Sequence, residues 1–337
     1  MSFNVTPGSI RFNTDSMKLE YYHLGSVGFG TLAAGEWVQI TTDTPDVQTG
    51  GTRGVFGFDF PTANTIDYIN IDSTGDAINF GNMLENNQQG AACSSSTRGL
   101  FMGGATPAVT NRIQYITIAS TGDTIDFGNL SSTNHANAGV SNQTRGISAG
   151  GSNPSTIDVI EYVTIASLGD AIDFGNLTAI RRNPGGCASS TRGLIAGGTN
   201  SPLFLNAIDF ITISTLGNAA DFGDIGQQSE MVGCSNSIRG IFATHHISPG
   251  ANNNTIEYVT ISTLGNAIDF GDRSNTERFP GTTASPTRGV FAGGQPSYVT
   301  TIDYIQIMSL GDAVDFGDLT EGRSTIAGLS NGHGGLG

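Results

Sequence analysis

Lysine is nearly absent from this chain. Lysine and arginine together number 14 among 337 residues, and Lys18 is the one lysine. Charged residues make up 13%, and the formal net charge is −15 at pH 7. An acidic surface repels phosphate, which argues against binding to nucleic acid or to an anionic membrane. No apolar run approaches the roughly 18 residues that a membrane-spanning helix needs, so no membrane association is expected.

Signals for secretion and for long helices are also scarce. The N-terminal stretch MSFNVTPGSIRF has neither a basic segment nor an apolar core of the secretory type, so we expect no signal peptide. Alanine, leucine, glutamate and lysine, which favour helices, are infrequent, whereas glycine alone accounts for 48 residues. This composition predicts short strands joined by tight turns.

The dominant feature of the sequence is a repeat of 45–49 residues. A TRG or IRG tripeptide begins one block, a segment of the type I-D/E-Y-φ-T-I follows, and GDAIDFG ends the unit. The repeat arginines are Arg53, Arg98, Arg145, Arg192, Arg239 and Arg288. The acidic position of the second block is held by Asp67, Gln114, Glu161, Asp209, Glu257 and Asp303, with glutamine as the single departure.

Almost all of the length variation lies in one connection of the unit. The acidic position precedes the phenylalanine of GDAIDFG by 13 residues in all six units, as Asp67 precedes Phe80. The distance from the repeat arginine to the acidic position instead varies from 14 to 18 residues. The unit is therefore a scaffold of constant length with one variable loop.

Each unit divides into four short strands, a to d. In the fourth unit these are GGCASST, RGLIAGG, AIDFITIS and AADFGDI. Strand c carries apolar residues on both faces, which indicates a sheet packed between two neighbours. Four-stranded sheets repeated with this period predict an all-β protein, a β-propeller.

The repeat resembles that of the kelch family of propellers. Kelch repeats have an apolar strand ending in Gly-Gly, then a tyrosine, then an aromatic residue, and Gly103-Gly104, Tyr115 and Phe127 follow this order. The chain departs from it by using phenylalanine where kelch repeats favour tryptophan. It also lacks the glycine pair in the first and fifth units, which have Phe58-Asp59 and Thr244-His245.

The number of blades depends on how the ring closes. Six full repeats occupy residues 45–320, and residues 1–44 and 321–337 together slightly exceed one further blade. We favour seven blades, the last built from N-terminal strands and C-terminal closing strands, because such closure removes exposed sheet edges. The alternative is a six-bladed ring with residues 1–44 as a small β-hairpin module.

The repeated polar residues are interpreted as structural. A residue that recurs in every blade serves the architecture, so each repeat arginine should pair with the acidic residue of strand c or with carbonyls at the blade edge. Asp170 of GDAIDFG is replaced by Asn218 and Asn266 in other units, which favours a turn over a calcium loop. No metal or other cofactor is expected.

The three cysteines occupy one equivalent position. Cys93, Cys187 and Cys234 each lie five residues before a repeat arginine, on strand a. We interpret them as small buried side chains facing the ring axis and expect no disulfide, since equivalent strands of neighbouring blades are usually too far apart.

The candidate binding residues lie in the variable b–c connections. These connections span roughly 59–65, 105–112, 152–158, 199–207, 246–255 and 295–301 and share one face of a propeller. Leu203, Phe204 and Leu205 stand together where a loop should be polar, which predicts contact with a partner. The pair His245 and His246 is interpreted as structural or as a ligand contact. The full set of candidates is Asp59, Arg112, Leu203, Phe204, Leu205, His245, His246 and Tyr298.

Tandem repeats of this type, with a C-terminal NGHGGL, resemble virion structural proteins of marine tailed phages, including those of cyanobacteria. The resemblance implies a non-enzymatic tail fibre, baseplate protein or capsid appendage, made in the host bacterial cytoplasm. Its partners would be other virion proteins, further copies of itself in the particle, or a glycan or protein of the host surface.

Two alternatives belong to other functional classes. A lectin-like propeller would bind sugars through aromatic residues of the b–c loops, where Phe60, Phe204 and Tyr298 are available. A kelch-type enzyme would need titratable groups at the ring centre, and no catalytic motif emerges from the sequence.

Overall fold

The chain forms two compact units, Met1–Thr49 and Gly50–Gly337. The structure is a computed structural model and describes residues 9–13, 18–23, 36–39, 52–60, 64–105, 108–243, 246–247 and 251–336. In the first unit three strands form an antiparallel sheet in the order β1-β2-β3. They are β1 (Ile10–Asn13), β2 (Lys18–His23) and β3 (Glu36–Gln39).

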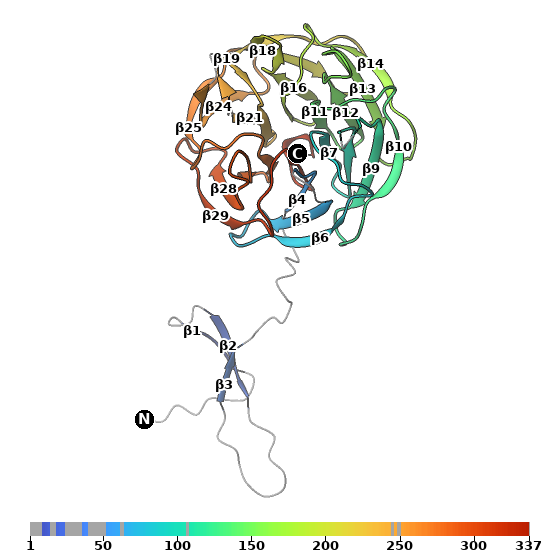
Figure 1. Ribbon diagram of the computed structural model, residues 1–337. Coiled ribbons are helices and arrows are strands. Elements are labelled where there is room, and N and C mark those ends of the chain that lie inside the picture. Colours follow the sequence, from blue (N-terminus) through green and yellow to red (C-terminus); the bar gives the residue numbers. More distant parts are fainter. Residues whose placement is uncertain are drawn as a thin grey trace, which may run out of the picture. The chain divides into compact units, whose positions relative to one another are not determined.

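The second unit is a six-bladed β-propeller (Figure 1). Each blade is an antiparallel sheet whose strands a to d run from the ring axis outward. The first three blades are β30 (Ala327–Ser330), β4 (Arg53–Gly57), β5 (Thr65–Asn70), β6 (Ile78–Asn82); β7 (Ala91–Ser94), β8 (Arg98–Met102), β9 (Arg112–Thr117), β10 (Ile125–Asn129); and β11 (Ala138–Ser141), β12 (Arg145–Ala149), β13 (Val159–Thr164), β14 (Ile172–Asn176).

The other three blades follow the same plan, with additions in the fourth. They are β15 (Gly185–Ala188), β16 (Arg192–Ala196), β18 (Leu203–Thr212), β19 (Ala220–Ser229); β20 (Val232–Ser235), β21 (Arg239–Ala243), β24 (Thr255–Thr260), β25 (Ile268–Asp272); and β26 (Gly281–Ala284), β27 (Arg288–Ala292), β28 (Thr301–Gln306), β29 (Val314–Asp318). The short strands β17 (Thr199–Asn200), β22 (His246–Ile247) and β23 (Ala251–Asn252) enlarge the fourth blade, and a 3-10 turn (Gly334–Leu336) follows β30.

The all-β propeller is confirmed, but the seven blades that we favoured are wrong. Strand β30, near the C-terminus, pairs with β4 through Ala327↔Gly57 and Ser330↔Gly54 and becomes the inner strand of the first blade. The first repeat therefore takes its strand a from the far end of the chain, and six repeats close into six blades. The described N-terminal strands pair with one another instead of completing a blade.

The six repeat arginines join neighbouring blades. Each guanidinium lies 4.5–4.6 Å from the centre of an aromatic ring on strand c of its own blade. In the first blade, for example, Arg53 lies over the ring of Tyr68. Each Nη1 also donates to a carbonyl of the next blade at 2.7–3.1 Å, and Arg288 of the sixth blade reaches Ile71 of the first. The planar fork suits this double contact.

The acidic position of strand c forms a second joint, with the preceding blade. Asp67 accepts hydrogen bonds from the backbone N–H and the hydroxyl of Thr320, which follows β29. In three joints the partner is a fully buried arginine. These ion pairs are Arg323–Asp67 at 2.7 Å, Arg181–Asp209 at 3.1 Å and Arg273–Asp303 at 3.1 Å. Gln114, the departure from the pattern, is bonded by the backbone of Leu84 and by Thr124.

The GDAIDFG block forms a third joint, at the outer edge. Gly169 and Ala171, in the turn before β14, donate their N–H groups to carbonyls of Phe127 and Asn129 in the preceding blade. The carboxylate of Asp170 accepts from the N–H of Asn129 at 2.9 Å. Asn218 and Asn266 accept equivalent bonds, because an amide oxygen serves as well as a carboxylate. The outermost strands are thus partly paired, which protects them from edge-to-edge association.

Candidate binding face and axial channel

The predicted hydrophobic loop of the fourth blade is a strand. Leu203, Phe204 and Leu205 begin the ten-residue β18, and Phe204 pairs with Thr199 of β17. Leu205 pairs with Gln228 of β19, so strands c and d both continue past the length they have in other blades. Leu203 is 63% exposed, whereas its two neighbours are half-buried. Main-chain pairing therefore holds an aliphatic side chain out into solvent.

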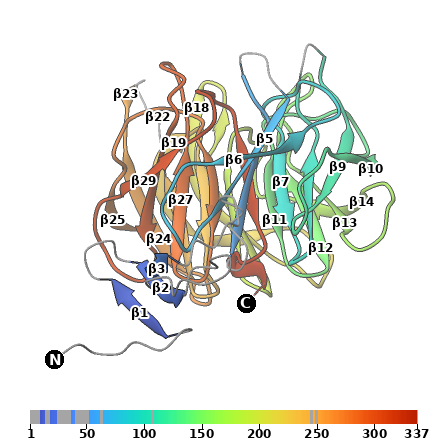
Figure 2. The same ribbon diagram turned by 90° about the horizontal axis from the view of Figure 1, so that it is seen from below.

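The b–c connection of the fifth blade adds to the same sheet. Strand β22 pairs with β19 through Gln228↔Ile247 and Ser229↔His246, and β23 pairs with β22. The fourth blade becomes a seven-stranded sheet, whose added strands lie at the end of the propeller opposite the C-terminus (Figure 2). Of the predicted histidine pair, the backbone of His246 belongs to β22, and His245 lies outside the described residues.

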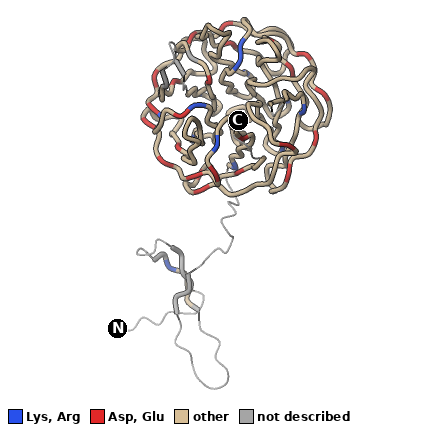
Figure 3. Tube along the Cα trace, viewed as in Figure 1, with Lys and Arg blue, Asp and Glu red and all other residues tan. Residues whose placement is uncertain are grey.

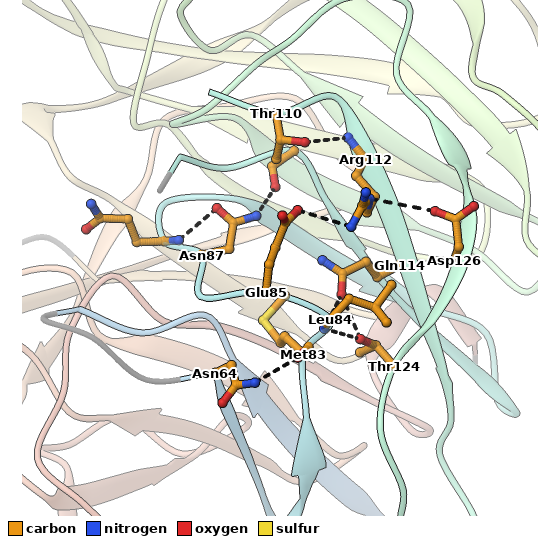
Figure 4. Close-up of polar contacts among 12 residues, drawn as sticks. Asn64, Met83, Leu84, Glu85, Asn87, Thr110, Arg112, Gln114, Thr124 and Asp126 are labelled. Atoms are coloured by element: carbon orange, nitrogen blue, oxygen red, sulfur yellow. Dashed lines mark hydrogen bonds and ion pairs between the residues drawn. The ribbon is translucent and has the colours of Figure 1, made fainter. Parts of the chain in front are cut away.

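Arg112 is tied into the joint between the first two blades (Figure 4). Its guanidinium lies 3.4 Å from Glu85 and 3.8 Å from Asp126, and these side chains are all substantially exposed. Exposed pairs of this kind contribute at most about 1 kcal/mol to stability. The backbone N–H of Leu84, which follows the first blade, donates to Gln114 of the second, so Arg112 is part of a surface network spanning two blades.

Phe60 and Tyr298, two of the aromatic residues considered for sugar binding, meet where the sixth blade joins the first. The ring of Tyr298 lies 5.9 Å from that of Phe60, so b–c connections of adjacent blades are in contact. Asp59 is next to Phe60 and is only 4% exposed, and its Oδ1 has no hydrogen-bond partner among the described residues. Burial raises the pKa of Asp59 to about 6, although the nearby Arg323 opposes the shift.

Replacing Asp59 should change the pH dependence of stability. The carboxyl group titrates near 4 when the chain is unfolded and near 6 when folded, so the contribution of Asp59 to stability is greatest below this window and falls as pH rises through it. Asp59→Asn removes the ionisation and should raise the free energy of unfolding at pH 8 by roughly 1–3 kcal/mol, with little gain at pH 4. Urea unfolding at both pH values measures this difference.

Asp173→Asn provides the control, since that carboxylate is exposed. It should alter stability similarly at pH 4 and pH 8. Parallel pH profiles for Asp59→Asn and the parent protein would show that Asp59 ionises freely in the fold.

A channel follows the ring axis, with a volume of about 160 Å³ and the six inner strands as its walls. At the b–c end, the residue two positions before each inner strand has a φ of 54–60°, and none is glycine. These residues are Gln89, Ala136, Asn183, Glu230, Phe279 and Thr325. Their left-handed geometry turns the peptides along the circle: Ala136 donates to the carbonyl of Gln89 at 2.7 Å, and Asn183 donates to that of Ala136 at 2.8 Å.

The opposite end of the channel is closed by the C-terminal tail. His333 Nε2 lies 3.0 Å from the carbonyl oxygen of Ser94, and its Nδ1 accepts from the N–H of Gly335. The imidazole is therefore neutral with its hydrogen on Nε2, and burial lowers the pKa of His333. A Cβ at Gly334 or Gly335 would come within 2.1 Å of a backbone oxygen, which explains these two glycines of NGHGGL. Figure 1 shows the C-terminus at the ring centre.

The three cysteines are buried in the strands that form the channel wall. The Sγ atoms of Cys93, Cys187 and Cys234 lie 2.7–2.9 Å from the point where a Cβ would stand on Gly146, Gly240 and Gly289 of the next blade. All three thiols are buried and unpaired by disulfides. Burial raises the pKa of Cys93 and of Cys234 to about 12, so both are inert at neutral pH.

The sequence analysis did not predict the polar residues of the channel as candidate site residues. Glu230 lies at the mouth and pairs with Arg278 at 3.3 Å, and Asn137 is buried in the wall with an unpaired Oδ1. A partial signal was present, because Glu230 and Asn137 lie two residues and one residue before strand a of their blades. At the position of Glu230 the side chain differs in every blade, so the sequence did not indicate the left-handed backbone that all six residues share.

Comparison with known proteins adds no relative. No family model matches the chain, and no curated protein matches it. Within the described residues, no helix is long and apolar enough to cross a membrane, and no cluster of three or more histidine, cysteine, aspartate or glutamate side chains could hold a metal ion.

Proposed function

We propose that this protein is a rigid, non-enzymatic binding module that presents the b–c face of its propeller to a macromolecular partner. The observation that carries the proposal is the enlarged fourth blade. Its extra strands hold Leu203 in solvent at 63% exposure through main-chain pairing, and Phe204 and Leu205 beside it are only half-buried, so three apolar side chains adjoin on this edge. A fixed apolar contact on a rigid ring loses little entropy on binding.

The setting that we propose is the virion of a tailed phage, as a kelch-like tail fibre, baseplate protein or capsid appendage. The support is the resemblance of the tandem TRG and GDAIDFG repeats to such proteins, together with an architecture in which all three repeated blocks form joints between blades. A ring joined in this way suits a particle that must persist outside the cell.

The proposal is tested by gold-labelled antibody against this protein on purified phage particles from its source. Label at the tail tip would favour host recognition, and label over the head would favour capsid decoration. Absence of label from both intact and detergent-opened particles, with label on the recombinant protein as a positive control, would overturn the virion assignment.

A glycan is the second candidate partner, favoured by the Phe60–Tyr298 pair at the joint between the sixth and first blades. Aromatic faces stack on sugar rings, and both side chains are only half-buried. A glycan array discriminates the two candidates: binding lost in Tyr298→Ala but retained in Leu203→Ser would indicate a lectin.

A further inference from the structure

The turns between strands c and d expose a repeated leucine. Leu168, Leu216, Leu264 and Leu310 occupy one equivalent position in blades three to six and are 55–61% exposed. Four residues later, strand d begins with a second exposed aliphatic side chain in three of these blades, Ile172, Ile268 and Val314, at 52–58%. We call these seven side chains the rim arc.

The four leucines of the rim arc are held rigidly and are not needed for the fold. The turn around Leu168 is bonded on both sides, by Gly169 to Phe127 and by Ala171 to Asn129 of the preceding blade. Blades one and two make the same bonds with Thr74 and Thr121 in place of leucine. The joint therefore accepts a polar side chain, and the four leucines require another explanation.

The charge around the rim arc is negative. The c–d turns and d strands of blades three to six carry nine aspartates, all exposed. The four repeat arginines nearby are half-buried, each stacked on a ring and bonded to a carbonyl of the next blade. Figure 3 shows acidic segments distributed around the outer circumference of the ring. A second copy of this surface, or an anionic lipid, would be repelled.

We propose that the rim arc is a docking surface for a protein partner whose own surface carries aliphatic side chains flanked by lysine or arginine. The leucines supply apolar contact, and the aspartates select a basic partner over acidic ones. Because four adjacent blades repeat the site, an elongated or repetitive partner gains affinity from several contacts at once. In an antiparallel blade the c–d turns lie at the end opposite the b–c connections, so this surface does not depend on the proposed function of the b–c face.

The test uses three synthetic peptides of equal length as probes: one of alternating leucine and lysine, one of serine and lysine, and one of leucine and glutamate. Fluorescence anisotropy measures their binding to the full chain and to a variant with Leu168→Thr, Leu216→Thr, Leu264→Thr and Leu310→Thr. This variant copies Thr74 and Thr121, keeps the net charge, and should melt at the temperature of the parent protein. Leu84→Thr is the control, because Leu84 is 47% exposed and follows strand d of the first blade, at the opposite end of the propeller.

We expect the leucine–lysine peptide to bind the parent at least about tenfold more tightly than it binds the fourfold threonine variant, with Leu84→Thr like the parent. The serine–lysine peptide should bind weakly to all proteins, and the leucine–glutamate peptide should not bind. The reverse substitutions, Thr74→Leu with Thr121→Leu, should strengthen binding by extending the arc.

Equal affinity of the leucine–lysine peptide for parent and threonine variant would overturn the proposal, because charge alone would then explain binding. Absence of binding to the parent would also overturn it. Concentration-dependent dimerisation of the parent that the threonine variant loses would instead assign the arc to contact between copies.

Discussion

A chain that ends before β30, lacking residues 326–337, is expected to lose its cooperative thermal transition. Strand β30 is the inner strand of the first blade, and its absence leaves β4 with an unpaired edge at the ring axis. Leu329 is buried and packs against Gly99 of the second blade, and Ile326 packs in the core shared by the sixth and first blades. Losing two such side chains costs about 2–5 kcal/mol each, comparable with a typical total stability of about 5–15 kcal/mol.

Two other deletions provide controls, with circular dichroism and limited proteolysis as readouts. Removing residues 331–337 keeps β30 and should lower the melting temperature without abolishing the transition. Removing residues 1–49 should leave the propeller transition unchanged, because that segment is a separate compact unit. A synthetic peptide of residues 321–337, added to the chain lacking 326–337, should restore part of the transition. An unchanged melting temperature in that truncated chain would contradict this account of closure.

Asp67→Asn is expected to destabilise the propeller by about 3–5 kcal/mol. The substitution leaves the fully buried Arg323 without its carboxylate, and a buried charge that loses its partner costs this much. Thr320 can still donate to the amide oxygen, so the loss isolates the ion pair from the neighbouring hydrogen bonds. Urea unfolding at pH 7 measures the free energy difference.

The matched control for the ion pair is Glu161→Gln. Glu161 holds the equivalent position in the third blade, and the structure gives it a backbone partner, Ser131, in place of a buried arginine. Its substitution should cost about 1 kcal/mol or less. The double variant Asp67→Leu with Arg323→Met removes both charges and should be more stable than Asp67→Asn alone. Similar losses for Asp67→Asn and Glu161→Gln would show that the ion pair is not what stabilises this joint.

The period and the constant spacing of the repeat were enough to predict a propeller of four-stranded blades. Strands b and c are recognisable because both faces are apolar, a pattern that only a sheet packed between neighbours requires. Of the candidate binding residues, Asp59, Arg112 and Tyr298 do lie at blade joints of the b–c face, which follows from the topology of an antiparallel blade.

Tertiary contacts decided the rest. Closure could not be predicted from the sequence because strand a is only four residues long, and both termini contained segments that could have formed it. Leu203 to Leu205 resembled a loop because their strand is stabilised by β17 and by pairing with β19, which no local pattern records. The left-handed ring at the channel mouth arises because hydrogen bonds between blades impose one φ on six unlike residues, Phe279 and Thr325 among them. Local propensity would have placed glycine there, and the closed ring overrides it.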